Sequence, residues 1–226
     1  MTDSTPPDPN FFFPVHELEH SVLKLALYDP SLHSQAFFDG LVDHPECFTY
    51  LPRLPFPSVA SVDVWFEEKN RKDKARVLFA MIDKTRSNQV AGVVGLLNTV
   101  PENLSTELGI IMVLPAFQRT HVTRTALGLL LRYCFDELRL RRVQWRTDPE
   151  NIASIRACER VGFQREGIRR WERVAPPGVP GHAPRKGDPM PNCTGWHSLT
   201  LAICWDDWEE RVSEHVATML GDSEKR

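Results

Sequence analysis

The sequence predicts an α/β domain in which helices flank a central sheet. First, short β-rich segments alternate along the chain with longer segments whose apolar residues recur at helical spacing. Second, the β-rich segments 76–82 and 89–97 are joined by a polar turn, which is typical of a hairpin. Third, the chain has 226 residues, of which 42% are hydrophobic, enough for one domain with a substantial core.

The first half of the chain supplies two helices and four strands in this prediction. Residues 22–27 form the first strand, and Ser31 caps a helix that runs to about residue 42. A second helix covers 58–70, where apolar residues recur at helical spacing. The hairpin strands follow, and 106–113 forms a further strand that stops before Pro115.

The second half continues the alternation. Apolar residues at i, i+3, i+4, i+7 and i+11 predict an amphipathic helix over 120–138. A strand over 142–148 follows, and then a helix capped by Asn151 and ended by Gly162 in a left-handed conformation. Phe163 starts the next strand, and residues 197–205 form the last one.

One domain is predicted over residues 15–210. Residues 1–14 are predicted to be a flexible leader, because they are rich in Pro and polar residues. Residues 174–195 contain too much Pro and Gly for a regular element, so we expect a loop inserted between two paired strands. Residues 211–226 are predicted to contain a helix end and a polar tail.

The bulk composition excludes several classes of protein. The net charge is −3, with Lys+Arg 27 against Asp+Glu 30, so no basic field would recruit nucleic acid or a membrane surface. The five cysteines are odd in number, widely spaced and contain no Cys-x-x-Cys pair. The amino terminus has neither a basic region nor an apolar segment of signal-peptide length. A cytoplasmic protein is therefore expected.

Residues 118–123 lie between a predicted strand and a predicted helix, a geometry suited to holding phosphates. Free backbone N–H groups in the first turn of a helix, together with the helix dipole, point at an anion placed there. Threonine hydroxyls would add donors, and Arg and His would add positive charge. The alternative is that this polar stretch only caps its own helix. The predicted anion-binding residues are Gln118, Arg119, Thr120, His121, Val122 and Thr123.

A second motif is more specific. Residues 151–163 read Asn-Ile-Ala-Ser-Ile-Arg-Ala-Cys-Glu-Arg-Val-Gly-Phe and are followed by Glu166-Gly167. This stretch resembles the Asn-x-x-Ser-x-Arg…Glu-Lys-x-Gly-Phe…Glu-Gly motif of the GCN5-related N-acetyltransferases (GNAT), particularly the branch of the ribosomal-protein alanine acetyltransferases and many small-amine acetyltransferases. The family's phosphate loop, Gln/Arg-x-x-Gly-x-Gly/Ala, falls on 118–123, where His121 and Thr123 replace its small residues. The resemblance covers residues 22–209.

The resemblance implies a mixed, mostly antiparallel sheet in which two parallel strands splay apart to form a cofactor cleft. It also implies acetyl-coenzyme A as the acetyl donor and a primary amine as the acceptor. The residues implied to contact the cofactor outside the phosphate loop are Ile111, Met112, Val113, Asn151, Ser154 and Arg156. The first three would offer backbone groups to the pantetheine arm, and their alternative role is ordinary sheet core.

Glu107 and Ser154 are the predicted catalytic residues. An ammonium ion has no free lone pair, so a base must remove a proton before the amine attacks. Glu107 lies eleven positions before Gln118, in the register of the base in several family members. Alternation places Glu107 on one face with Gly109, 111 and 113, a mostly apolar face on which a carboxylate holds a proton more firmly than in water. Many relatives carry a Tyr acid where this chain has Cys158, so the resemblance implies that Ser154 assists the departing thiolate instead.

The acceptor side is predicted to involve Glu107, Trp171, Glu172 and His197, with the loop 174–195 as a wall. Glu172 is the second candidate for the base. The expected partner is a small-molecule amine. The alternatives are a protein N-terminus as the acceptor, or a non-catalytic module that only binds acyl-coenzyme A. The sequence leaves open the acceptor, the acyl length, and whether the chain is a monomer or a homodimer.

No metal is expected. His16-Glu-Leu-Glu-His20 fits the pattern His-Glu-x-x-His, which on a helix would place two zinc ligands on one face. Pro14 precedes this segment, a strand follows it at once, and no third ligand is evident. A polar lead-in to the first strand is the preferred interpretation.

Overall fold

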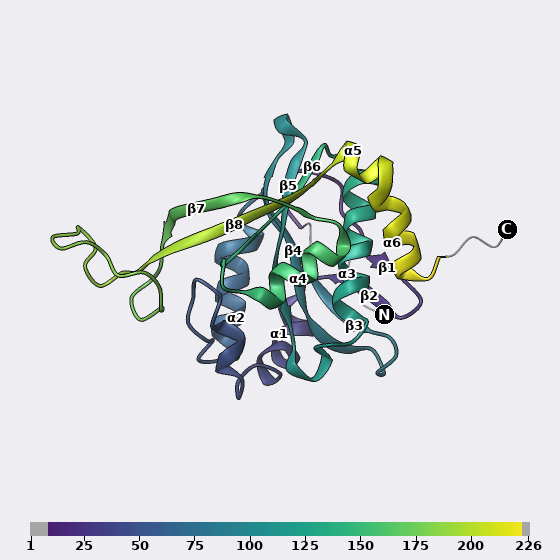
Figure 1. Ribbon diagram of the computed structural model, residues 1–226. Coiled ribbons are helices and arrows are strands. Elements are labelled where there is room, and N and C mark those ends of the chain that lie inside the picture. The colour runs from purple at the N-terminus through teal and green to yellow at the C-terminus, as the bar shows by residue number, and fades with distance from the viewer. Residues whose placement is uncertain (1–8, 223–226) are drawn as a thin grey trace.

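A computed structural model describes residues 9–222 as one eight-stranded sheet with helices packed against it (Figure 1). The strand order is β1-β2-β3-β4-β5-β6-β8-β7. The strands are Leu18–Glu19 (β1), Leu23–Leu27 (β2), Val77–Asp83 (β3), Gln89–Val100 (β4), Ser105–Val113 (β5), Arg142–Thr147 (β6), Gln164–Val174 (β7) and Gly195–Cys204 (β8). β5 and β6 pair in parallel, whereas the other neighbours are antiparallel. The predicted mixed, mostly antiparallel sheet is confirmed.

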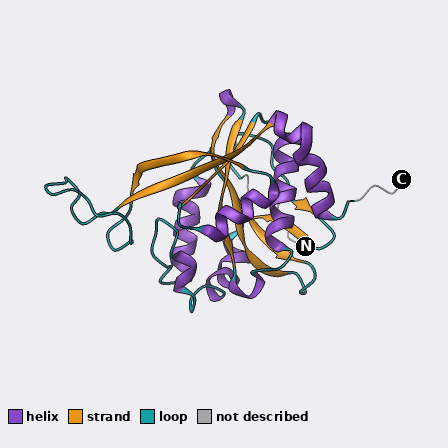
Figure 2. Cartoon of the chain, in the orientation of Figure 1, coloured by secondary structure: helices purple, strands orange, loops and turns teal. Residues whose placement is uncertain are grey.

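The helices form two groups (Figure 2). They are Pro30–Asp39 (α1), Val59–Phe66 (α2), Val122–Arg132 (α3), Ile152–Val161 (α4), Trp205–Asp207 (α5) and Ser213–Leu220 (α6). Single π-helical turns continue α2, α3 and α5. α1 packs against α2, whereas α3 packs against both α4 and α6. Among residues 9–222, no helix combines the length and the apolar character needed to cross a membrane.

Several element boundaries differ from the predictions. The residue that caps α1 is Asp29, whose side chain accepts the backbone N–H of Ser31 at 2.9 Å, because Pro30 takes the first helical position that proline favours. α3 begins at Val122 rather than at 120. The segment 16–20, predicted to be a polar lead-in, contains the short strand β1.

The C-terminal helical segment is part of the core. Its residues Val212, Val216 and Leu220 are buried, and Leu220 packs on Gly128 of α3, where an added Cβ would lie 3.0 Å from its side chain. The helical segment runs from Trp205 to Leu220, so the boundary predicted at 210 falls inside it. Residues 1–8 of the predicted leader and 223–226 of the predicted tail lie outside the described residues.

β5 and β6 stop pairing part of the way along their length. Their register covers three pairs and ends at Glu107↔Gln144, although β5 continues to Val113 and β6 to Thr147. Ile110 has a φ of 50° and lies in a bulge, between the β4 pairings of Gly109 and Met112. The extra residue reverses the alternation, so Met112 returns to the face of Glu107. The predicted grouping of Glu107 with residues 111 and 113 is therefore wrong.

β7 and β8 form a long hairpin that projects from the rest of the chain and carries the loop between them at its tip (Figure 1). The loop has its own small buried cluster of Ala175, Val179 and Trp196. His182 and Gly195 exchange two backbone hydrogen bonds of 2.9 Å, which brace the loop across its base. The loop therefore has defined internal contacts rather than being an irregular connection.

Candidate active site

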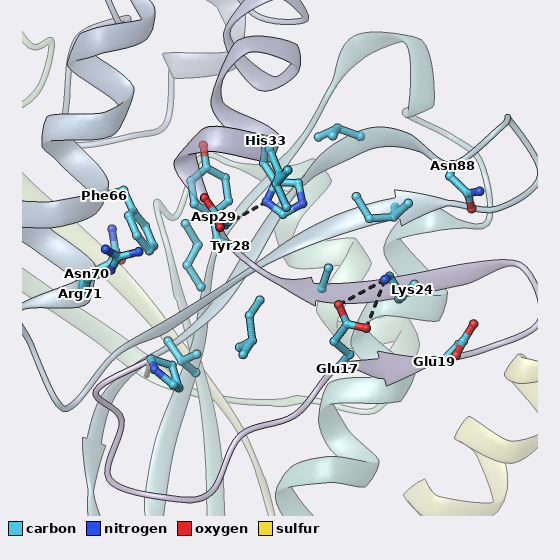
Figure 3. Close-up of a pocket in the computed structure, with 18 of the residues that line it drawn as sticks. Glu17, Glu19, Lys24, Tyr28, Asp29, His33, Phe66, Asn70, Arg71 and Asn88 are labelled. Carbon is cyan, nitrogen blue, oxygen red and sulfur yellow. Dashed lines mark hydrogen bonds and ion pairs between the residues drawn. The ribbon is translucent and has the colours of Figure 1, made fainter. Parts of the chain in front are cut away.

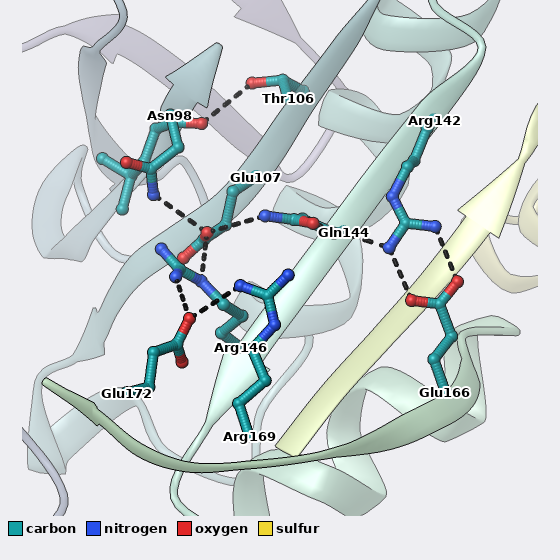
Figure 4. Close-up of polar contacts among 10 residues, drawn as sticks. Asn98, Thr106, Glu107, Arg142, Gln144, Arg146, Glu166, Arg169 and Glu172 are labelled. Carbon is teal, nitrogen blue, oxygen red and sulfur yellow. Dashed lines mark hydrogen bonds and ion pairs between the residues drawn. The ribbon is translucent and has the colours of Figure 1, made fainter. Parts of the chain in front are cut away.

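Glu107 is buried, with 5% of its surface exposed, at the point where β5 and β6 diverge. Three N–H donors converge on its oxygen Oε2: Asn98 Nδ2 at 2.9 Å, Gln144 Nε2 at 3.1 Å and Arg146 Nε at 2.6 Å (Figure 4). These donors give the buried oxygen the hydrogen-bond partners that a buried polar group requires. The expected apolar surroundings of Glu107 are therefore wrong, because a polar network surrounds its carboxylate.

Arg146 joins Glu107 to the other candidate base, Glu172. Its Nη1 donates to Glu172 Oε1 at 2.7 Å, and Arg169 donates to the same oxygen at 2.9 Å (Figure 4). Burial opposes ionisation of Glu172, but hydrogen bonds from Ser198, Arg169 and Arg146 outweigh it and lower its pKa to about 2. Burial also opposes the charge on Arg146, yet the two carboxylates raise its pKa above the usual value. Glu172 and Arg146 are therefore both charged at neutral pH.

The register of the sheet explains why these side chains meet. Gln144 is the direct neighbour of Glu107 across the parallel pair, and Arg146 lies two residues further along β6, on the same face. Near the other end of β6, Arg142 makes a bidentate pair with Glu166 at 2.5 and 2.6 Å. Glu166 of the Glu-Gly motif thus links β7 to β6 through its side chain. Arg146 was missed in the sequence analysis. The alternation of side chains along the strand places Arg146 on the same face as Gln144, and this spacing could have identified it.

Ser154 lies in the first turn of α4 and is held at two points. Its backbone N–H is capped by Asn151 Oδ1 at 3.1 Å, and its Oγ accepts a hydrogen bond of 3.0 Å from the indole of Trp145. Gly162 ends the helix with a φ of 117°, in the left-handed region. The predicted cap and terminus of this helix are confirmed. Arg156 is exposed on the same helix.

Some of the residues predicted to bind phosphates instead bond the backbone just before α3, whereas others are unpaired in the described part of the chain. Thr120 Oγ1 donates to the carbonyl of Phe117 at 2.6 Å, and Gln118 Nε2 donates to the carbonyl of Val113 at 3.3 Å. His121, which precedes α3, makes no side-chain cap, but Thr120 Oγ1 accepts the backbone N–H of Val122 at 3.3 Å. Within residues 9–222, the side chain of Arg119 makes no hydrogen bond or ion pair, and it is exposed. The backbone N–H groups of Thr123 and Arg124, together with Arg119, remain available to an anion.

His121 faces the protein rather than the start of the cleft. Its Nε2 lies 3.4 Å from Oδ1 of Asp83, which is fully buried at the end of β3. From the same turn, Arg86 donates to the carbonyl of Ala116 at 2.8 Å and covers the ring of Phe117. The turn after β3 therefore supports the segment that leads into α3, a role that sequence reasoning did not find.

Of the predicted acceptor residues, Glu107 lies on β5, whereas Trp171, Glu172 and His197 lie together on the β7–β8 hairpin. Trp171 has a φ of 54° and donates its backbone N–H to Nδ1 of His197 at 3.0 Å. His182 from the loop stacks on His197, with ring centroids 3.9 Å apart. Gly195 is required there, because a Cβ would lie 2.1 Å from the Trp171 ring. Glu172 follows Trp171 in the chain and bonds Arg146, so the aromatic group lies next to the charged network.

A cavity of about 650 Å³ lies elsewhere, over β1 to β4 and beside α1 and α2 (Figure 3). Two lysines on its rim are already paired, Lys24 with Glu17 at 3.1 Å and Lys84 with Glu19 at 2.6 Å. No residue of β5 to β8 lines it, so it is separate from the Glu107 network.

The His-x-x-x-His segment beside this cavity does not present two metal ligands on one helix. It is extended at β1, where His16 lies 3.4 Å from Glu137 and His20 Nε2 lies 3.1 Å from the carbonyl of Leu220. A second group, Cys204, Asp206 and Asp207, brings its ligand atoms within 4.8 Å of one another. Asp207 there accepts hydrogen bonds from Gln164, Arg211 and a backbone N–H, which cap the C-terminal helix.

Comparison with known families agrees with this geometry. Residues 23–164 match the family described as the acetyltransferase (GNAT) domain, which is more than half of the chain. The chain therefore belongs to the GNAT acetyltransferase family. The family and its relatives indicate an N-acetyltransferase enzyme.

Individual relatives support the same class. A probable N-acetyltransferase, YjcK of Bacillus subtilis (strain 168), is 28% identical over 104 residues, which span 46% of this chain and 58% of that protein. The crystal structure of a GCN5-related N-acetyltransferase from Brucella melitensis is 26% identical, with a TM-score of 0.76 over 97% of this chain and 90% of that one. A spermidine N-acetyltransferase from Vibrio cholerae, solved with coenzyme A and spermine, shares the fold at 20% identity and a TM-score of 0.63, over 84% of this chain and all (100%) of that one.

Proposed function

We propose that this protein transfers an acetyl group from acetyl-coenzyme A directly to the primary amine of a small molecule, with Glu107 as the base. The observation that carries the proposal is the position of Glu107 at the divergence of β5 and β6. Its three donors all contact Oε2. No donor within residues 9–222 forms a hydrogen bond with the other oxygen, Oε1. That oxygen would accept the proton of the amine, directly or through water.

The cleft residues fit the cofactor that the family uses. The unpaired backbone after Glu107, including the bulge at Ile110, would accept the extended pantetheine arm beside 111–113. The N–H groups of Thr123 and Arg124 in the first turn of α3, with Arg119, would receive the phosphates, and Asn151 and Arg156 would contact the cofactor from α4. Acetyl-coenzyme A would supply the acetyl group as a thioester. Ser154 would then hydrogen-bond the sulfur as it leaves.

The charges of the site favour a small monoamine over a polyamine. Glu107 and Glu172 are each paired with arginine, so the charges of Glu107, Arg146, Glu172 and Arg169 cancel. A polycation gains most from carboxylates that are not already neutralised. The spermidine named for the Vibrio cholerae protein is therefore not the acceptor that we propose here.

A protein N-terminus is the second candidate acceptor, as in the ribosomal-protein branch that the sequence resembles. The half-exposed Trp171 supports this alternative, because 55% of its surface is available to a larger acceptor. The loop borders the same side, since a Cβ on Gly178 would lie 3.7 Å from Leu54. The acceptor class is thus a matter for direct assay.

The deciding experiment follows the free thiol released from acetyl-coenzyme A with a panel of small monoamines, spermidine and a short peptide with a free N-terminus. We expect turnover with a monoamine and a rise in melting temperature with coenzyme A alone. Turnover with the peptide alone would establish the second candidate. A thermal response without thiol release from any amine would indicate a non-catalytic binder, and no thermal response at millimolar coenzyme A would remove the proposal.

A further inference from the structure

The indole of Trp145 contacts the hydroxyl of Ser154. Trp145 lies on β6 and is 4% exposed, and its Nε1 is 3.0 Å from Ser154 Oγ. The ring packs edge-on against Phe163, with centroids 5.6 Å apart at 68°. Packing therefore fixes the direction of the indole N–H.

The chemistry of the two groups decides which one donates. An indole N–H can only donate, so Ser154 Oγ must accept this bond. The hydroxyl hydrogen of Ser154 is then left to donate to another group. A serine in a helix otherwise tends to donate to a carbonyl of the preceding turn, which would consume that hydrogen. No hydrogen bond from Ser154 Oγ to such a carbonyl forms within residues 9–222, so the indole holds the serine oxygen while its hydroxyl hydrogen stays free to donate.

The backbone of Ser154 is fixed as well. Asn151 Oδ1 accepts the N–H of Ser154 at 3.1 Å, so the side chain starts from a defined position in the first turn of α4. The cysteine that replaces the expected tyrosine offers no alternative acid. Burial raises the pKa of Cys158 to about 12, and its Sγ points to the carbonyl of Ile155 at 3.2 Å. Ser154 is therefore the group at this helix that is oriented to donate.

We propose that Trp145 is a positioning residue that commits the hydroxyl of Ser154 to the departing thiolate. This inference rests on the proposed function. In the transfer step the amine nitrogen bonds to the acetyl carbon, the carbon–sulfur bond breaks, and its electron pair goes to sulfur. The proton lost by the amine goes to Glu107. Ser154 stabilises the new charge on sulfur with a hydrogen bond, and Trp145 keeps that hydrogen bond available.

A double-mutant cycle tests this role. Trp145→Phe keeps a ring against Phe163 but removes the N–H, and Ser154→Ala removes the hydroxyl. We expect Trp145→Phe to lower kcat by about tenfold, the effect of one hydrogen bond, with the KM for acetyl-coenzyme A unchanged. In the Ser154→Ala background, Trp145→Phe should have no further effect on kcat, because its partner is already absent.

The outcomes separate this inference from the proposed function. If the unmodified protein releases no thiol with any amine, the proposed function fails first. If it is active and Trp145→Phe keeps its kcat, or lowers kcat equally in both backgrounds, the positioning role is overturned and the contact is structural. The melting temperature of each variant is measured beside its kcat, so that a loss of stability is separated from a loss of positioning.

A second variant covers the case in which Trp145→Phe does not fold. Benzothienylalanine at position 145 replaces the indole N–H by sulfur at nearly the same size and shape. It should give the same loss of kcat with a melting temperature close to that of the unmodified protein. An unchanged kcat in this variant also overturns the proposal.

Discussion

Glu107 and Glu172 share one arginine but differ in what their surroundings allow. Glu172 receives Arg146 and Arg169 on Oε1, and its pKa is held at about 2, too low for a base at neutral pH. Its Oε2 is buried without a hydrogen-bond partner in the described part of the chain. Glu107 receives all three of its donors on Oε2, and no donor within residues 9–222 contacts its Oε1. The comparison indicates that Glu172 anchors Arg146, whereas Glu107 is placed to take a proton.

The largest expected effect separates these two roles. Glu107→Gln should lower kcat by about 100-fold or more, the usual contribution of a general base, and leave the KM for acetyl-coenzyme A within about twofold. Glu172→Gln should lower kcat far less. Steady-state kinetics of both variants with the best amine will measure this. Equal losses of kcat would break the distinction between the two carboxylates.

Removal of the shared arginine should destabilise the protein. Arg146→Met leaves two carboxylates of low exposure without their partner, so we expect the free energy of unfolding to fall by about 3 kcal/mol or more. Arg142→Met is the matched control on the same strand. Its partner Glu166 is 41% exposed, so the loss there should be about 1 kcal/mol. Urea unfolding of both variants compares them, and equal losses would show that Arg146 is not the centre of the network.

Acid should release the stabilisation that Glu172 provides. Its pKa is lowered from 4.5 to about 2 in the folded protein. The contribution is therefore fully present above about pH 4.5 and is lost as the pH falls toward 2. Over that interval, the unmodified protein should lose on the order of 2–3 kcal/mol more of its unfolding free energy than Glu172→Gln does. Parallel curves for the two proteins would show that Glu172 is not held in its charged form.

The smallest effect is expected at the exposed end of the network. Arg169 is 63% exposed, so Arg169→Ala should cost about 0.5 kcal/mol and change kcat by less than about twofold. Thermal melting and the thiol assay measure both quantities. A large fall in kcat would place Arg169 beside the acceptor instead of behind Glu172.

Local signals in the sequence predicted much of this structure. The helix from Asn151 to Gly162 was predicted with its cap and terminus because both depend on neighbouring residues. The hairpin of β3 and β4 was likewise predicted from its polar turn, whereas the mixed sheet was implied by the family resemblance. The bulge at Ile110 was not predicted, because the positive φ falls on a β-branched residue that rarely adopts it rather than on the adjacent Gly109.

The charged network around Arg146 and the contact of Trp145 with Ser154 could not be predicted from neighbouring residues in the sequence. Arg146 reaches Glu107 across 39 positions, and the turn at Asp83 reaches His121 from another strand, so both depend on the register of the assembled sheet. The contact of Trp145 with Ser154 spans only nine positions, yet it requires a turn geometry that single residues do not specify. The C-terminal helix was predicted only as a helix end and a polar tail, although Val212, Val216 and Leu220 recur at helical spacing and are buried.

The strand order has a consequence for how the site is assembled during synthesis. β8 lies between β6 and β7, so β7 has no partner in the sheet until the segment Gly195–Cys204 has left the ribosome. A fragment ending at residue 174 would contain Glu107, Arg146 and Glu172, but would lack β8, the strand through which β7 joins the sheet. Competence for catalysis therefore arrives with the final quarter of the polypeptide.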